Sequence, residues 1–412
     1  MNKTLWIINE YAGSPYHGME FRHYYLSKEL VKRGYNVYII TASYSHLFYN
    51  KPEIKEDFTI DNIDGINYVW VKVPEYKESH DKKRVLKWFI FTFKTYFNLP
   101  IDKFSKPNII LVSPMAPFPI ISGYKWAKKF KARLFYEVKD IWPLTLIEIG
   151  GYSPNHPFIK LMEWFERFAY KKTEKVISVL PLAWKHMEKQ GMNKSKFVYI
   201  PNGIDLEDYN INEPLPKEME AKIAKDKFII GYTGTIGKAN ALEFLIDAAY
   251  KLKGYKDIVF LIVGKGMEEN NLKNKVKDLE LDNVIFLPPV KKTQVQSVLK
   301  LVDVCYIGLR NEKIFEFGVS PNKLFDYMYA GKPILYAINS GNKPVEEANC
   351  GISVDAENPD AIANGILKLY NLSQEGRKKL VENGKNYVLK YHTYKYIADK
   401  FEEIINGWVR KD

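Results

Sequence analysis

Residues 318–333 read Gly318-Val-Ser-Pro-Asn-Lys-Leu-Phe-Asp-Tyr-Met-Tyr-Ala-Gly-Lys-Pro333. The stretch combines a turn, a helix that we expect to begin near Pro321, and a strand that follows Pro333. The N-terminus of a helix presents unpaired N–H groups and partial positive charge, so it favours phosphate. Lys323 adds a full charge there, and Asp326 can accept hydrogen bonds from hydroxyl groups such as those of ribose. The stretch therefore predicts a site for a nucleotide diphosphate.

The same alternation of short apolar runs with longer amphipathic ones extends along the whole chain. We predict strands at Leu5–Asn9, Asn36–Thr41, Asn108–Ser113, Arg133–Val138 and Val176–Leu180, and again at Phe228–Thr233, Ile258–Val263, Val284–Leu287, Val304–Gly308 and Ile334–Ala337. Alternation of this kind is typical of doubly wound α/β domains with parallel sheets.

Two such domains are expected, because 412 residues exceed one ordinary hydrophobic core. The turn Pro201-Asn-Gly-Ile-Asp205 and the polar residues after it form the predicted linker. We therefore assign residues 1–202 to an N-terminal domain and residues 203–390 to a C-terminal one. A last helix, about 391–412, is expected to pack back on the first domain. Ligands of open α/β sheets bind beyond the carboxyl ends of the strands, so two sheets facing a cleft would hold one ligand on each wall.

The charge of the chain is uneven. The net charge is +12, and residues 1–200 carry all of it, with 31 Lys and Arg against 19 Asp and Glu. Such an excess suits nucleic acid, anionic lipid or a phosphorylated acceptor. Two cysteines, Cys305 and Cys350, lie in no metal-ligand spacing and favour a reduced, cytoplasmic protein. No stretch approaches the roughly 20 apolar residues of a transmembrane helix.

Glycine-containing turns follow several predicted strands. In Gly231-Tyr-Thr-Gly-Thr-Ile-Gly-Lys-Ala-Asn240, Gly234 and Gly237 free the backbone and Lys238 can meet a pyrophosphate. Gly18, in the first βα turn, permits close approach of a phosphate, although it can equally be a turn glycine. Neighbouring His17 fits an exposed loop residue better than a catalytic one. The first βα turn matches neither a dinucleotide-binding nor a P-loop pattern.

Together and in this order, these motifs resemble the retaining GT-B glycosyltransferases of family 4. The matching segments are Ile200-Pro-Asn-Gly-Ile-Asp205, Tyr232-Thr-Gly-Thr-Ile-Gly237, Val263-Gly-Lys-Gly266 and Ser320-Pro-Asn-Lys-Leu-Phe-Asp-Tyr-Met328. The segment Glu137-Val-Lys-Asp-Ile-Trp-Pro143 is similar to the L-fucosamine-type transferases of bacterial surface polysaccharides.

The resemblance implies a nucleotide-sugar, usually a UDP-sugar, on the C-terminal domain. It implies that Asp326 contacts the ribose and that Val290 contacts the base. The residues that it places around the diphosphate are Ser320, Lys323 and Leu324, with Lys238 and Arg310 as further cations. The family's first motif glutamate would occupy the position of Gly318, and Glu316 stands two residues too early. We expect backbone amides at residues 318–320 to meet the sugar hydroxyls instead.

For catalysis we assign Lys323 and Lys238 to stabilising the leaving diphosphate, because cations aimed at developing charge contribute most to such a reaction. Asp140 is the candidate for orienting or deprotonating the acceptor hydroxyl, with a turn or helix-capping aspartate as the alternative. No Asp-x-Asp occurs in the chain, so a metal that bridges the diphosphate has no evident ligand pair. We predict transfer without a metal or other cofactor.

Two predicted helices combine lysines with aromatic residues, over residues 82–97 and 125–133. On the first, Lys83, Lys87 and Lys94 would share one side. Cations beside aromatic side chains suit peripheral docking on the inner face of a membrane. An ordinary solvated helix is the alternative.

The preferred interpretation is a retaining transferase that moves a sugar, N-acetylated hexosamine being one candidate, from UDP to a polyprenyl-diphosphate-linked or other glycan acceptor. A GT-B nucleotide-sugar epimerase is one alternative. A non-catalytic protein that binds nucleic acid or an anionic surface is the other. The non-catalytic protein would bind DNA with steep salt dependence and would have no affinity for UDP.

Overall fold

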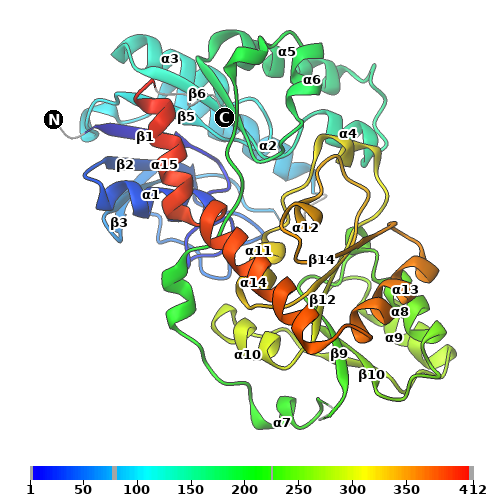
Figure 1. The fold of residues 1–412 in the computed structure, drawn as a ribbon. Coiled ribbons are helices and arrows are strands. Elements are labelled where there is room, and N and C mark those ends of the chain that lie inside the picture. The colour runs from blue at the N-terminus through cyan, green and yellow to red at the C-terminus, as the bar shows by residue number, and fades with distance from the viewer. Residues whose placement is uncertain (1–2, 77–80, 224–225, 408–412) are drawn as a thin grey trace. The chain divides into compact units, whose positions relative to one another are not determined.

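The computed structural model describes residues 3–76, 81–223 and 226–407. The chain divides into two compact units (Figure 1). The first comprises Met1–Asn202 and Tyr394–Asp412, and the second comprises Gly203–Thr393. Residues 408–412 of the predicted last helix, and residues 224–225 of the predicted linker, lie outside the described part of the chain.

The first unit contains an eight-stranded sheet in the order β3-β4-β2-β1-β5-β6-β7-β8. Every strand pair is parallel except the hairpin of β3 and β4. The hairpin and the short last strand were not predicted. The strands are β1 (Thr4–Ile8), β2 (Asn36–Ala42), β3 (Phe58–Ile63), β4 (Ile66–Val71), β5 (Ile109–Val112), β6 (Arg133–Val138), β7 (Lys175–Ser178) and β8 (Phe197–Tyr199).

Helices cover both faces of this sheet. Its helices are α1 (Arg22–Lys32), α2 (Lys82–Phe97), α3 (Ile120–Phe130), α4 (Leu144–Glu148), α5 (Pro157–Lys172), α6 (Trp184–Lys189) and α15 (Tyr394–Ile405). One core joins α1 and α15 to alternate residues of the strands, such as Leu5 and Ile7. On the other face α3 lies close to β5, where Gly123 leaves room for Val112. This alternation buries apolar strand residues on both sides, as expected of a parallel sheet.

The second unit contains a six-stranded, fully parallel sheet in the order β11-β10-β9-β12-β13-β14. Its strands are β9 (Phe228–Thr233), β10 (Ile258–Val263), β11 (Val284–Leu287), β12 (Val304–Gly308), β13 (Ile334–Ala337) and β14 (Gly351–Val354). Its helices are α7 (Lys217–Glu220), α8 (Leu242–Lys251), α9 (Glu269–Asp278), α10 (Val295–Lys300), α11 (Asn322–Tyr329), α12 (Pro344–Glu347), α13 (Pro359–Tyr370) and α14 (Gln374–Tyr391). Five of the six strands have the predicted bounds.

Helix α2 is oriented differently from the sequence-based expectation. Lys87 is fully buried, its Nζ donates to the backbone oxygen of Glu10 at 3.0 Å, and it lies 3.7 Å from the ring centroid of Tyr11. The predicted alignment of Lys87 with Lys83 on a solvent-facing side is therefore wrong. The exposed apolar residues of α2 are Leu86, Phe89, Phe93 and Phe97. Within the described residues, no helix has the length and apolar character needed to cross a bilayer.

Candidate functional site

The side chain of Lys323 lies against the glycine loop that follows β9. Its Nζ donates to the Tyr232 hydroxyl at 2.8 Å and to Asn240 Oδ1 at 3.3 Å, and lies 4.1 Å from the Tyr232 ring centroid. Desolvation lowers the pKa of the Lys323 amine to about 8. No carboxylate among the described residues pairs with this amine. A cation held by neutral groups at the start of α11 retains its attraction for an incoming anion.

Backbone close approach shapes the loop around Lys323. Gly234 has φ +137°, and a Cβ added there would lie 3.0 Å from Lys323 Nζ. A Cβ on Gly264 would lie 1.8 Å from the backbone oxygen of Gly234, whereas one on Gly237 would meet only the Thr235 methyl at 3.6 Å. Gly264, which follows β10, thus holds the Gly234 turn beside the lysine.

Gly264→Ala should therefore destabilise the second unit by about 1–3 kcal/mol or more, because the new Cβ would overlap a backbone oxygen at a φ of +155°. Gly237→Ala is the matched control and should change the unfolding free energy by less than about 0.5 kcal/mol. Urea unfolding of the two variants measures the difference. Equal stability of both would contradict the packing described here.

Asp326 also lies on α11, and its carboxylate is already engaged. The Tyr209 hydroxyl donates to Asp326 Oδ1, and the Tyr209 ring lies 4.2 Å from the ring of Tyr329. Burial raises the pKa of Asp326 despite this hydrogen bond. Any ribose hydroxyl that approaches Asp326 must share the carboxylate with the Tyr209 phenol or displace it. Tyr209 lies in the 3₁₀ turn Leu206–Asn210 and was not predicted as a site residue.

The turn before α11 differs from the expectation for residues 318–320. Gly318 adopts φ +101°, and its amide donates to the backbone oxygen of Phe315 at 2.9 Å. The Val319 amide donates to Asn342 Oδ1 at 2.8 Å. These two amides are therefore already satisfied inside the unit. Glu316 lies exposed in the 3₁₀ turn Lys313–Phe317.

Two further residues that were predicted to bind the sugar donor have other surroundings than expected. Arg310 forms ion pairs with Glu243 and, at 3.1 Å, with Glu357, so its charge is compensated within the unit. Its Nε also donates to the backbone oxygen of Lys238 at 3.2 Å. Leu324 is fully buried in the core, and its amide donates to the Pro321 oxygen. The predictions that Arg310 neutralises the diphosphate and that Leu324 contacts it are therefore corrected.

The remaining predicted residues of this unit stay compatible with a ligand at the carboxyl edge of the sheet. The Lys238 side chain is exposed and has no partner among the described residues. Ser320 is half-buried just before α11. Val290 is half-buried beyond the end of β11.

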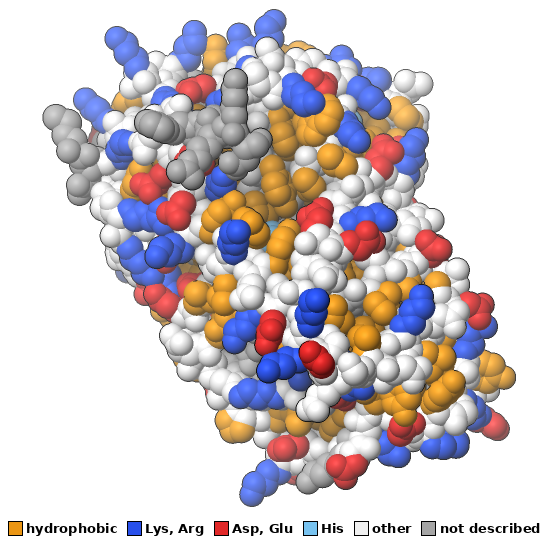
Figure 2. All heavy atoms as spheres, in the orientation of Figure 1, with side chains coloured by type: hydrophobic (Ala, Val, Ile, Leu, Met, Phe, Trp, Pro, Cys, Tyr) orange, Lys and Arg blue, Asp and Glu red, His pale blue; other side chains and the backbone are white. Residues whose placement is uncertain are grey.

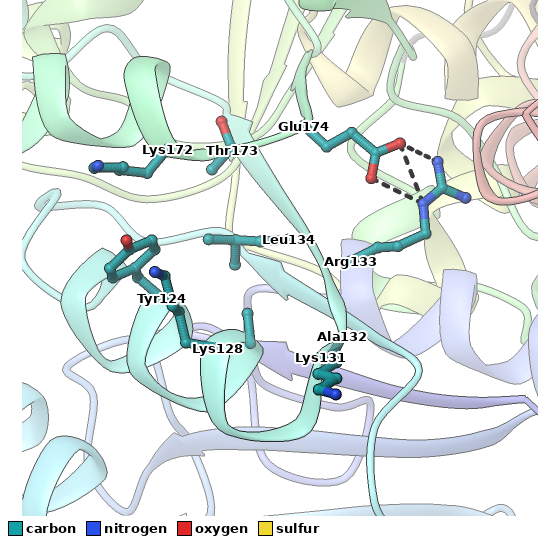
Figure 3. Close-up of a pocket in the computed structure, with 10 residues that line it drawn as sticks. Tyr124, Lys128, Lys131, Ala132, Arg133, Leu134, Lys172, Thr173 and Glu174 are labelled. Atoms are coloured by element: carbon teal, nitrogen blue, oxygen red, sulfur yellow. Dashed lines mark hydrogen bonds and ion pairs between the residues drawn. The ribbon is translucent and has the colours of Figure 1, made fainter.

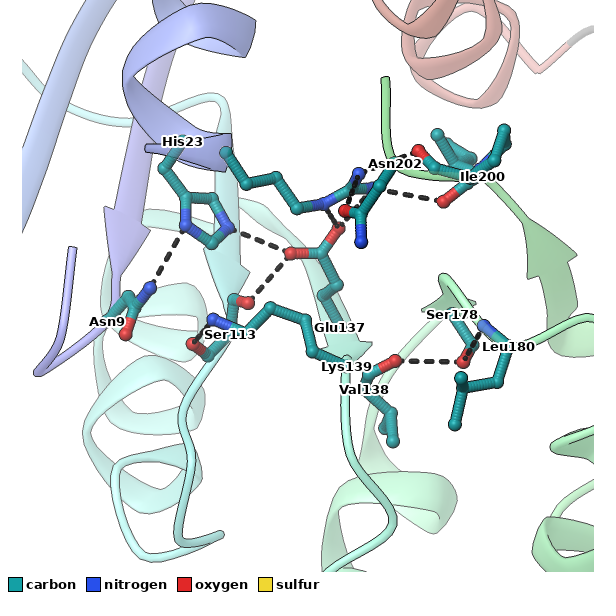
Figure 4. A network of polar contacts seen from close by, with 12 residues as sticks. Asn9, His23, Ser113, Glu137, Val138, Lys139, Ser178, Leu180, Ile200 and Asn202 are labelled. Atoms are coloured by element: carbon teal, nitrogen blue, oxygen red, sulfur yellow. Dashed lines mark hydrogen bonds and ion pairs between the residues drawn. The ribbon is translucent and has the colours of Figure 1, made fainter. Parts of the chain in front are cut away.

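In the first unit, the carboxyl ends of β5 and β6 hold a buried polar network centred on Glu137 (Figure 4). Glu137 Oε1 accepts from Arg22 Nη2 at 2.9 Å, and Oε2 accepts from His23 Nε2 at 2.8 Å and from Ser113 Oγ at 2.7 Å. Burial alone would raise the pKa of Glu137, but the positive charge of Arg22 and the His23 hydrogen bond hold it well below its usual value.

Arg22 extends this network to residues 200–202, where the first segment of this unit ends. Its Nη1 donates to the Pro201 oxygen at 2.7 Å and to Asn202 Oδ1 at 3.1 Å, and its Nη2 donates to the Ile200 oxygen at 3.1 Å. The network thus fixes the segment that leads into the second unit. The sequence reasoning missed it, although an acidic residue inside the apolar run 133–138 was an available signal.

Beside the network, Lys139 Nζ pairs with Glu20 Oε2 at 2.6 Å. Asp140 follows it, two residues beyond the end of β6. The residue is exposed and its carboxylate has no hydrogen-bond partner among the described residues, while desolvation raises the pKa of the carboxyl. Asp140 is therefore available to a ligand at this edge of the sheet.

The first βα turn does not place Gly18 at a helix start, as the sequence had suggested. Helix α1 begins four residues later, at Arg22, and the Gly18 amide donates to the Ser14 oxygen. A Cβ on Gly18 would lie 2.4 Å from the Leu47 oxygen. Gly18 thus serves a close loop contact rather than a helix N-terminus. His17 is half-buried, and its Nδ1 is 2.8 Å from Ser14 Oγ.

Two family models match consecutive parts of the chain. Residues 16–208 match the model "Glycosyltransferase Family 4", and residues 216–387 match "Glycosyl transferases group 1". The protein named for glycosyl transfer in colanic acid biosynthesis, WcaI of Escherichia coli strain K12, is 23% identical over 312 residues, which are 73% of this chain and 75% of that protein. The lipopolysaccharide 1,2-N-acetylglucosaminetransferase of Salmonella typhimurium strain LT2 is 22% identical over 223 residues, 52% of this chain and 57% of that protein.

Solved structures share the fold across nearly the whole chain. Sucrose-phosphate synthase from Thermosynechococcus elongatus superposes with a TM-score of 0.72 at 16% identity, covering 98% of this chain and 99% of the other. Anabaena HepE, solved in complex with UDP, superposes with a TM-score of 0.66 at 14% identity, covering 98% and 100%. The predicted GT-B fold class, two Rossmann-like α/β domains with parallel sheets, is thereby confirmed.

Proposed function

Because this chain belongs to the group 1 glycosyltransferases, with a family 4 domain in its first half, we propose that it transfers a sugar with retention from a UDP-sugar to a lipid-linked glycan of a bacterial surface polysaccharide. The observation that carries the proposal is the Lys323 amine, held by Tyr232 and Asn240 beside the Gly234 turn without a carboxylate partner. A structure with this fold binds UDP, which favours UDP as the nucleotide.

In the proposed reaction the bond between the sugar and the diphosphate breaks, and negative charge develops on the leaving phosphate. Lys323 and the exposed Lys238 stabilise that charge, and Asp326 holds the ribose. Asp140 in the first unit orients the acceptor hydroxyl or accepts its proton. The reaction as proposed needs no metal and no further cofactor. One relative is named as an N-acetylglucosaminetransferase. The first sugars to test are therefore N-acetylated hexosamines, including one of the L-fucosamine type.

A thermal-shift screen against UDP, GDP, ADP and their sugars tests the proposal. We expect UDP and one or more UDP-sugars to raise the melting temperature, because a ligand at 100 times its dissociation constant stabilises the folded state by about 2.7 kcal/mol. GDP and ADP are the controls for the base. A protein that responds to no nucleotide, and instead binds DNA with steep salt dependence, would contradict the proposal.

A further inference from the structure

A pocket of about 360 Å³ opens in the first unit, beside the C-terminal ends of α3 and α5 (Figure 3). Arg133, which begins β6, and Glu174, which directly precedes β7, belong to its lining. The pocket therefore lies at the amino ends of these strands, whereas Glu137 and Asp140 lie at their carboxyl ends. It is a second site on this unit, separate from the candidate acceptor residues.

The one carboxylate in the lining is neutralised by its neighbour. Glu174 Oε2 accepts from Arg133 Nε at 2.9 Å, and the two side chains point toward each other in Figure 3. Arg133 also donates to the backbone oxygen of Ile404 at 3.2 Å. This pair contributes no net charge to the pocket.

Three lysines of the lining, Lys128, Lys131 and Lys172, are exposed and have no carboxylate partner among the described residues. Lys128 and Lys172 extend toward Tyr124, each with its Nζ 5.6 Å from the ring centroid (Figure 3). Lysine in the last turn of a helix stabilises that helix by about 0.3–1 kcal/mol. Helix capping thus explains a lysine at each helix end, but not why the amines of Lys128 and Lys172, from two helices, lie beside the same ring.

Exposed aromatic side chains lie on α5, beside the pocket, and on α2, which contacts α3. The Tyr124 ring is 5.3 Å from that of Phe168, which stacks on Trp164 at 5.5 Å. Trp164 is 56% exposed and Phe97, on α2, is 61% exposed. Helix α3 contacts both α2 and α5, so these side chains share one side of the sheet. Figure 2 shows Lys and Arg side chains gathered along the edge of this unit over α3 and α5.

We propose that this pocket binds the phosphate of an anionic phospholipid and thereby docks the first unit on a membrane. Lys128 and Lys172 contact the phosphate from both sides of Tyr124, whose hydroxyl lies at the headgroup level. Trp164 and Phe97 enter the interface, where amphipathic and aromatic side chains are favoured. A small soluble phosphate would use the lysines but would gain nothing from exposed aromatic residues. This docking mode replaces the one based on Lys87.

Vesicle flotation tests the proposal with phosphatidylcholine vesicles that contain or lack phosphatidylglycerol. We expect the wild-type protein to float only with phosphatidylglycerol. Lys128→Glu/Lys172→Glu should lower the partition coefficient at least about tenfold, because each basic residue near an anionic surface contributes about 1 kcal/mol. Lys185→Glu/Lys189→Glu on α6 is the matched control for net charge, since both lysines are exposed there, and it should stay close to wild type.

Three results would overturn the proposal. The wild type could fail to float, or the pocket variant could float as well as the α6 variant. Alternatively, inorganic phosphate could raise the melting temperature of the wild type but not of the pocket variant, without any vesicle binding, which would assign the pocket to a soluble phosphorylated compound. Urea unfolding of the pocket variant at the wild-type midpoint, followed by a probe in the first unit, shows that this unit is folded. Flotation needs no nucleotide, which keeps this test separate from that of the proposed transfer activity.

Discussion

Replacing Lys323 by alanine lowers the rate of sugar transfer roughly 100-fold or more at saturating donor, while the protein stays folded. The expected loss corresponds to removing one preorganised group that faces the developing charge, about 3–4 kcal/mol of transition-state stabilisation. The side chain that is removed leaves only a phenol and an amide without its contact, and neither becomes a buried unpaired charge. Initial rates of UDP release with donor and acceptor measure the effect.

Lys238→Ala is the comparison for this variant, because Lys238 is exposed and no described residue holds its side chain. We expect a smaller decrease in rate than for Lys323→Ala.

The pKa of about 8 for Lys323 also predicts a pH dependence of donor binding. Donor affinity should fall as the pH rises through 8, since the neutral amine no longer attracts a diphosphate, and Lys323→Arg should remove that dependence. A Lys323→Ala enzyme with the wild-type rate would contradict the assigned role.

Replacing Arg22 by alanine destabilises the first unit by about 3–5 kcal/mol, the cost of leaving a buried charge without its partner. Glu137 would keep Ser113 and His23 but lose both guanidinium hydrogen bonds. The backbone oxygens at Ile200 and Pro201 would lose their donor as well. Urea unfolding followed by a probe in the first unit gives the change in free energy.

A control variant and a pH dependence make the prediction for Arg22→Ala specific. Glu75→Gln breaks an ion pair with Lys51 whose side chains are more than half exposed, and should cost less than about 1 kcal/mol. Because the folded-state pKa of Glu137 is lowered from 4.5, its stabilisation is present above pH 4.5 and is lost as the pH falls through the lower folded value. Stability that is unchanged in Arg22→Ala would refute the importance of the network.

The sequence predicted the architecture well, since local patterns carry it. Apolar runs such as Phe228–Thr233 and Ile258–Val263 became strands with the expected bounds. Within the second unit, Lys323 and Gly234 were singled out separately, and the structure brings them together. Both were recognisable because a helix start and a glycine turn leave local signals.

Contacts between distant residues could not be predicted in this way. Arg310 carries a charge that suits a diphosphate, but Glu243 and Glu357, 67 and 47 residues away, neutralise it. Periodicity showed that α2 mixes lysines with aromatic residues but could not decide which side is buried. Lys87 packs inside the unit against Glu10 and Tyr11. Phe89, Phe93 and Phe97 are exposed, whereas Phe91 is buried. Arg22 and Glu137 are 115 residues apart, and only the parallel sheet brings them into contact.

A crystal structure with UDP or a UDP-sugar bound tests the central claim most directly, through the position of the diphosphate. We predict a phosphate oxygen within about 3 Å of Lys323 Nζ, beside the Gly234 turn. A nucleotide bound elsewhere, with the Lys323 amine still hydrogen-bonded only to Tyr232 and Asn240, would contradict it.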